Sequence, residues 1–81
     1  MKSEIEIRLA SYIEKEILKQ PNRTIDPKNA LISSGLIDSF SLIDLALYVE
    51  DEFGVHINDS ELNASTFDSI EQLSNLIQAR S

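Results

Sequence analysis

Three Asp-Ser pairs could support group-transfer chemistry in this 81-residue chain: Asp38-Ser39, Asp59-Ser60 and Asp68-Ser69. A serine hydroxyl is a weak nucleophile, which reacts when a base or a metal ion activates it. An aspartate at the start of a helix has another common role, because its carboxylate accepts hydrogen bonds from the free amides of the first turn. The dipeptide alone is therefore a weak signal, and the position of each pair decides between the two roles.

The chain contains few residues that could form a catalytic site. His56 is the only histidine, and no cysteine is present to join it in a metal site. It lies between Val55 and Ile57, which indicates a structural or solvent-edge histidine. Gly35 and Gly54 are the only glycines, so a glycine-rich phosphate-binding loop cannot form. No strand–turn–helix pattern supports a Ser-His-Asp triad, and the acidic segments lack the spacing of a calcium loop. We expect no metal site and no enzyme activity.

The charges are distributed unevenly along the chain. The formal net charge is −7, and no lysine or arginine occurs from residue 29 to residue 79. Such a stretch repels nucleic acid and anionic membranes and attracts basic protein surfaces. We therefore expect protein partners with basic patches and no nucleic-acid partner, with a merely solvated acidic face as the alternative.

The length of the chain predicts one domain over residues 1–81. No apolar run approaches the ~20 residues that a membrane-spanning helix needs, so we expect no membrane insertion. The first residues show no signal-peptide core, and the lack of cysteine fits a reducing compartment. We expect a cytoplasmic monomer.

Helical periodicity predicts the elements that position the Asp-Ser pairs. A first helix is expected over about residues 2–20, opened by a capping box of Ser3 and Glu6 and ended by Pro21. Its apolar stripe contains Ile5, Leu9, Tyr12, Ile13 and Ile17. Residues 21–37 read as a long polar loop with a short helical turn near residues 27–31. The loop residues expected to reach the core are Ile25, Leu31, Ile32 and Leu36.

A second helix is expected from Asp38 or Ser39 to Phe53, with Asp38 as its N-cap and Gly54 in the left-handed position after its end. Its expected core stripe consists of Leu42, Ala46, Val49 and Phe53, widened by Ile43 and Leu47. Residues 55–57 are expected to form a brief extended piece, and no strand is predicted.

Two further cap-like pairs predict the rest of the fold. Asn58 with Glu61 predicts a short helix around residues 60–64. Asp68 with Glu71 predicts a last helix, with Arg80 near its end. The inward residues of that helix are expected to be Ile70, Leu73, Leu76 and Ile77. The predicted class is all-α, a small four-helix bundle of three main helices and a short third helix, with the long loop between the first two helices.

The segment Gly35-Leu36-Ile37-Asp38-Ser39-Phe40 leads into the most acidic helix of the chain. It resembles the motif of the carrier-protein family, which contains acyl carrier proteins and peptidyl carrier (thiolation) domains. In that family an Asp-Ser pair and an apolar residue begin the second helix of a four-helix bundle. The resemblance spans about residues 5–78 and includes the Gly-Val exit of the second helix. Helix capping is the expected role of the other two Asp-Ser pairs.

The resemblance implies that a phosphopantetheinyl transferase attaches 4′-phosphopantetheine from coenzyme A to Ser39. The distal thiol of that arm then carries cargo as a thioester, and the chain acts as a substrate of partner enzymes. Leu or Met is commoner in the family at the place of Phe40, which indicates somewhat different partners. The partner-binding residues implied by the resemblance are Asp38, Phe40, Asp44, Leu47, Glu50 and Asp51.

The expected cargo is an acyl group in a specialised fatty-acid- or polyketide-like pathway. Acidic residues follow Ser39 later than in the most familiar fatty-acid pattern, which argues against primary fatty-acid synthesis. The expected partners are the transferase, a loading enzyme and downstream synthase or transferase enzymes. One alternative is an aminoacyl carrier loaded by an adenylating enzyme. A remote alternative is an unmodified acidic adaptor that binds a basic protein.

Overall fold

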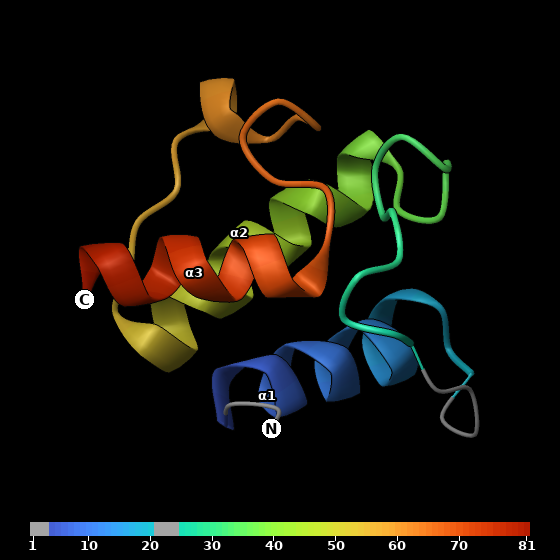
Figure 1. The fold of residues 1–81 in the computed structure, drawn as a ribbon, viewed down its shortest axis with the longest axis horizontal. Coiled ribbons are helices and arrows are strands. Elements are labelled where there is room, and N and C mark those ends of the chain that lie inside the picture. The colour runs from blue at the N-terminus through green and yellow to red at the C-terminus, as the bar shows by residue number, and fades with distance from the viewer. Residues whose placement is uncertain (1–3, 21–24) are drawn as a thin grey trace.

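The computed structural model describes residues 4–20 and 25–81, and its regular elements in these residues are all helical (Figure 1). In order they are α1 (Glu4–Tyr12), a π-helical turn (Ile13–Ile17), α2 (Ser39–Phe53), a 3-10 turn (Asp59–Glu61) and α3 (Ile70–Arg80). The all-α prediction is confirmed for the described part of the chain. No helix in that part is long and apolar enough to cross a membrane.

The first helix is shorter than predicted. α1 packs against α3 (Figure 1). Leu9 of α1 and Ile13, the first residue of the π-helical turn, are buried and form the centre of the predicted stripe. In the π-helical turn the Leu18 amide donates to the carbonyl of Ile13, 2.8 Å away, and Lys19 then adopts a left-handed φ of 55°. The helix therefore ends at about Ile17, because a left-handed residue cannot continue it. Ser3 and Pro21, which predicted its two ends, lie outside the described residues.

The described part of the first connection, residues 25–37, is irregular and well anchored. Its buried side chains are Ile25, Leu31 and Ile37, and Ile32 and Leu36 pack against the same core. The carboxylate of Glu14 also accepts from the amide of Ile25 at 3.0 Å. The predicted helical turn near residues 27–31 was wrong. Asp26 instead forms a tight turn, because its side chain accepts from the amide of Lys28 at 2.8 Å.

α2 begins and ends as predicted, and its predicted core stripe is confirmed, since Leu42 and Val49 are buried and Ala46 and Phe53 pack against the same core. Asp38 is the N-cap, and Gly54 ends the helix with a φ of 70°. The buried residues are Leu42, Leu45 and Val49, whereas Ile43 and Leu47 are exposed. The helix is turned this way because Tyr48 stacks on Tyr12 of α1, with ring centroids 4.1 Å apart. The Leu45 and Tyr48 side of α2 therefore meets α1, and the predicted widening of the core by Ile43 and Leu47 was wrong.

The predicted short helix is reduced to a single 3-10 turn, Asp59–Glu61. The predicted capping pair is present, since the amide of Asn58 donates to Glu61 at 3.1 Å. The helix does not continue to residue 64 because the side chain of Asn63 takes over backbone groups that a helix would use. It donates to the carbonyl of Ser60 at 2.8 Å and accepts from the amide of Thr66 at 3.0 Å.

α3 buries Ile70, Leu73 and Ile77, with Leu76 partly covered. Its N-cap is Ser69, whose hydroxyl accepts from the amide of Gln72 at 3.2 Å. The prediction that Asp68 opens this helix was wrong. The carboxylate of Asp68 points away from α3 and binds the first connection instead.

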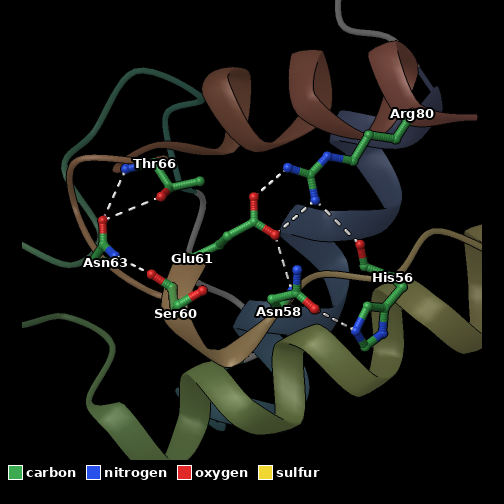
Figure 2. A network of polar contacts seen from close by, with 7 residues as sticks. All are labelled: His56, Asn58, Ser60, Glu61, Asn63, Thr66 and Arg80. Atoms are coloured by element: carbon green, nitrogen blue, oxygen red, sulfur yellow. Dashed lines mark hydrogen bonds and ion pairs between the residues drawn. The ribbon is translucent and has the colours of Figure 1, made fainter.

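A polar network ties the end of α3 to the 3-10 turn (Figure 2). The guanidinium of Arg80 makes two hydrogen bonds to the carboxylate of Glu61, one of them 2.9 Å long, and donates to the carbonyl of His56 at 3.3 Å. The Nε2 atom of His56 lies 2.9 Å from the side-chain oxygen of Asn58. The hydrogen bond from Arg80, followed by the one from the Asn58 amide, lowers the pKa of Glu61 from 4.5 to about 2.

The Glu61 network predicts that the difference in stability between the wild type and Glu61→Gln depends on pH. Because folding lowers the pKa of Glu61, its contribution is present above pH 4.5 and is lost as the pH falls to about 2. We expect Glu61→Gln to lower the thermal midpoint at pH 6 and to match the wild type near pH 2. Asp59→Asn, which removes a charge from the same turn, is the control. An equal deficit of Glu61→Gln at both pH values would contradict the prediction.

Candidate functional site

Ser39 is the first residue of α2 and is exposed. Its hydroxyl has no hydrogen-bond partner among the described residues. The preceding Asp38 is held in place, because its carboxylate accepts from the amide of Ser41 at 2.7 Å. That hydrogen bond lowers the pKa of Asp38 and keeps it ionised at the helix start. The result is an accessible hydroxyl on a rigid helix terminus.

The other two Asp-Ser pairs have different surroundings. Ser69 is only 7% exposed, and its hydroxyl is engaged as the cap of α3. Ser60 is exposed but lies within a turn of three residues. The capping role predicted for the Asp68-Ser69 pair is confirmed, although the cap is Ser69 and not Asp68. In the Asp59-Ser60 pair neither residue is the cap, because Asn58 caps the 3-10 turn. Ser39 is the one serine of the three that is exposed at the start of a long helix.

An apolar stripe continues from Ser39 along the outer side of α2. It consists of Phe40, Ile43 and Leu47, which are 81%, 47% and 60% exposed. The predicted contact residues Phe40 and Leu47 therefore lie on the surface. Ile43 was missed because it was assigned to the core. Its spacing of three residues from Phe40 and four from Leu47 is the signal that places it on the same helical face.

The predicted acidic residues also lie on the outer side of α2. Asp44, Glu50 and Asp51 are all exposed. Glu50 lies 2.9 Å from Nδ1 of His56, and this contact raises the pKa of the histidine. Negative charge is unfavourable at a helix C-terminus, so the acids in the last turn reduce the stability of α2 unless cations pair with them. Asp51 has no cationic partner in the described part of the chain.

Helical spacing brings these predicted residues together. Buried Leu42 and Val49 lie on one side of α2, and the apolar stripe with its acidic neighbours lies on the opposite side. Residues 40 and 51 are separated by eleven positions, or roughly 16 Å along a helix axis. The outer side of α2 is thus a single surface that begins at Ser39. Within the described residues, no group of three His, Asp or Glu side chains is arranged to hold a metal ion.

A family model described as phosphopantetheine attachment site matches residues 8–77, most of the chain. The chain belongs to this phosphopantetheine attachment family. It is therefore a carrier domain that bears covalent 4′-phosphopantetheine. Comparisons with curated proteins and with solved structures gave no significant match.

The start of α2 in this carrier domain fits the group that the family bears. Covalent attachment through a phosphodiester needs an accessible hydroxyl, and Ser39 offers one. A phosphate at the first turn of a helix lies at the positive end of the helix dipole, where negative charge is favourable. Residues 29–79 contain no lysine or arginine, so this segment has no cation to hold the phosphate. The covalent bond itself would retain the group.

Proposed function

We propose that this protein is an acyl carrier whose 4′-phosphopantetheine is attached to Ser39. The observation that carries the proposal is the free, exposed Ser39 hydroxyl at the first residue of α2, in a chain of the phosphopantetheine attachment family.

During attachment a bond forms between Ser39 Oγ and the β-phosphorus of coenzyme A. The bond from that phosphorus to the departing 3′,5′-ADP breaks, and the serine proton passes to a base of the transferase. When bound, the group supplies a thiol that holds cargo as a thioester.

In this proposal the chain is a substrate of other enzymes. A serine hydroxyl needs a base and charge neutralisation to attack phosphorus, and the transferase supplies both. Asp38 stiffens the helix start that presents the hydroxyl. We also propose the carrier architecture of a four-helix bundle, in which the 3-10 turn Asp59–Glu61 takes the place of the short third helix.

The proposed cargo is an acyl group of a specialised fatty-acid- or polyketide-like pathway. Phe40 and Ser41 follow Ser39, and the first acidic residue after the serine is Asp44. This order sets the surface next to the arm apart from the most familiar fatty-acid carriers. Loading assays with acyl- and aminoacyl-adenylating enzymes test the cargo. Acceptance of amino acids alone would replace the acyl proposal by the aminoacyl alternative.

The attachment is tested by incubating the protein with coenzyme A and a promiscuous phosphopantetheinyl transferase. We expect the intact mass to increase by one arm, and peptide mapping to place the arm on Ser39. An unchanged mass with several transferases would refute the proposal and favour the unmodified adaptor.

We propose that partner enzymes bind the outer side of α2 through a basic patch around an apolar contact. The apolar stripe supplies the contact, and Asp44, Glu50 and Asp51 supply the charge. Each exposed ion pair contributes about 0.2–1 kcal/mol, and physiological salt screens it over about 8 Å. Such charges accelerate association without making the complex long-lived, which suits a carrier that must leave each enzyme.

Reversing the charge of Glu50 and Asp51 tests this surface. We expect the double variant Glu50→Lys/Asp51→Lys to be modified roughly tenfold more slowly at low salt, because electrostatic steering raises association rates by about 10–10³-fold. It should remain folded, since cations are favourable in the last turn of a helix. Glu16→Lys/Asp59→Lys makes the same change in net charge outside α2. Equal rates for the two variants, measured by mass spectrometry, would contradict the prediction.

A further inference from the structure

The carboxylate of Asp68 binds three consecutive amides of the first connection. Its Oδ1 atom accepts from Leu31, Ile32 and Ser33 at 3.2, 2.7 and 2.9 Å. Its Oδ2 atom accepts from the hydroxyl of Ser33 at 2.5 Å. Successive amides of this kind form a concave anion site, and here an aspartate of the same chain occupies it. The sequence separation of 35 to 37 residues makes this a tertiary contact.

The segment that Asp68 holds leads directly to the start of α2. The amide of Leu31 also donates to the backbone carbonyl of Asp68 at 2.7 Å. The carbonyl of Leu31 accepts in turn from the amide of Ile37 at 3.0 Å, and the Ile37 side chain is buried. A continuous set of hydrogen bonds therefore runs from Asp68 through Leu31 to Ile37, the residue before the Asp38 cap.

The turn between these two contacts is closed by its own hydrogen bonds. The Ser34 hydroxyl donates to the carbonyl of Ala30 at 2.7 Å, and the Gly35 amide donates to that of Ile32 at 3.1 Å. Gly35 has a φ of 78°, which a residue with a side chain rarely adopts. Residues 31–37 thus form a compact unit, and Asp68 fixes its orientation on the rest of the domain.

We infer that Asp68 is a positioning residue for the modification of Ser39. This inference rests on the proposed function. The Ser39 side chain has no contact of its own within the described residues that fixes it, so its place depends on the backbone before it. Asp68 holds that backbone by binding residues 31–33. Loss of the carboxylate removes its contacts with residues 31–33 and loosens this backbone, although the backbone hydrogen bond from Leu31 to Asp68 remains. The outer side of α2, where the transferase is proposed to bind, is left unchanged.

The test compares Asp68→Ala with two matched variants in steady-state transfer from coenzyme A. We expect Asp68→Ala to lower kcat roughly tenfold, since a misplacement on the order of 1 Å can cost about 10²-fold, with KM for the carrier close to wild type. Asp68→Asn should restore kcat, because one side-chain oxygen can still accept from the three amides. Ser69→Ala removes the adjacent cap of α3 and should lower stability without lowering kcat.

Several results would overturn the inference. The first is a wild-type kcat in Asp68→Ala. The second is a decrease of kcat in Ser69→Ala equal to that in Asp68→Ala. The third is an Asp68→Ala variant in which KM rises while kcat stays at the wild-type value. If Asp68→Ala fails to fold, amide exchange in the wild type decides the matter. Because the Leu31 amide also has a backbone acceptor, the amides of Ile32 and Ser33 are followed. Their protection supports the contact with the Asp68 carboxylate, and exchange at the rate of a free peptide overturns the inference. Wild type and Ser39→Ala are assayed in parallel to test the proposed function separately. If neither protein is modified, or if both are, the proposed function is refuted and the inference fails with it. If only the wild type is modified, the proposed function stands and the Asp68 variants alone decide the inference.

Discussion

Ser39→Ala is expected to abolish the mass increase that the wild-type protein shows after incubation with coenzyme A and a phosphopantetheinyl transferase. Alanine has no oxygen with which to form the phosphodiester, so the loss is complete rather than graded. The variant should remain folded, because Ser39 is exposed, its side chain has no partner in the described part of the chain, and alanine has the best helix propensity. Intact-mass spectrometry measures the modification, and circular dichroism verifies the fold.

The other Asp-Ser pairs provide the controls for this result. Ser60→Ala and Ser69→Ala should both accept the arm to the same extent as the wild type. Ser69→Ala should also be destabilised, because loss of an N-cap typically costs about 0.5–2 kcal/mol. An arm found on Ser39→Ala would contradict the assignment, and peptide mapping would then identify the serine that carries it.

The ends of α2 could be predicted from sequence because their determinants are local. Asp38 reaches the amide of Ser41 three residues away, and Gly54 adopts a left-handed conformation that other residues rarely adopt. Such signals depend only on neighbouring residues. Ser39 lies immediately after this cap, and the resemblance of residues 35–40 to the carrier-protein motif, rather than the capping signals, predicts it as the attachment residue.

The full extent of the face that α2 turns toward the core could not be predicted in the same way, although Leu42, Ala46, Val49 and Phe53 were predicted correctly. Both sides of the helix carry large apolar residues, and its sequence allows more than one core stripe. The stack of Tyr48 on Tyr12 selects the side with Leu45, and Ile43 and Leu47 become surface residues. The orientation of α2 thus depends on a contact between residues 36 positions apart. The periodicity of a single helix contains no information about such a contact.

The roles of Asp68 and Glu61 were hidden for the same reason. Asp68 stands where a helix cap is expected, yet Ser69 beside it satisfies the helix and leaves Asp68 to bind residues 31–33. Glu61 was assigned to a local capping pair, and its stronger partner is Arg80, 19 residues away. Sequence pattern identifies residues that can cap or pair, whereas the tertiary fold determines which partner each one has.

Phe67→Ala is expected to cause the largest loss of stability among the changes considered. Phe67 is 1% exposed and is among the largest fully buried side chains in the core. Truncating a buried phenylalanine costs about 3–5 kcal/mol, through lost burial and the cavity left behind. A chain of 81 residues has a free energy of unfolding of roughly 4–12 kcal/mol, at about 0.05–0.15 kcal/mol per residue. The variant should therefore unfold at much lower urea concentration, or be unfolded without urea.

Phe40→Ala removes a phenylalanine side chain from the surface instead of the core. It should therefore slow modification while leaving stability nearly unchanged. Phe40 is 81% exposed, so its truncation should change the free energy of unfolding by less than about 0.5 kcal/mol. Modification should nevertheless slow, because the apolar contact next to Ser39 is lost to the transferase. Urea titration and transfer rates on both variants separate the two roles. A large loss of stability in Phe40→Ala would mean that this residue packs into the fold, and the apolar stripe would then not be a partner surface. A folded Phe40→Ala that is modified at the wild-type rate would remove Phe40 from that surface while leaving the attachment to Ser39 intact.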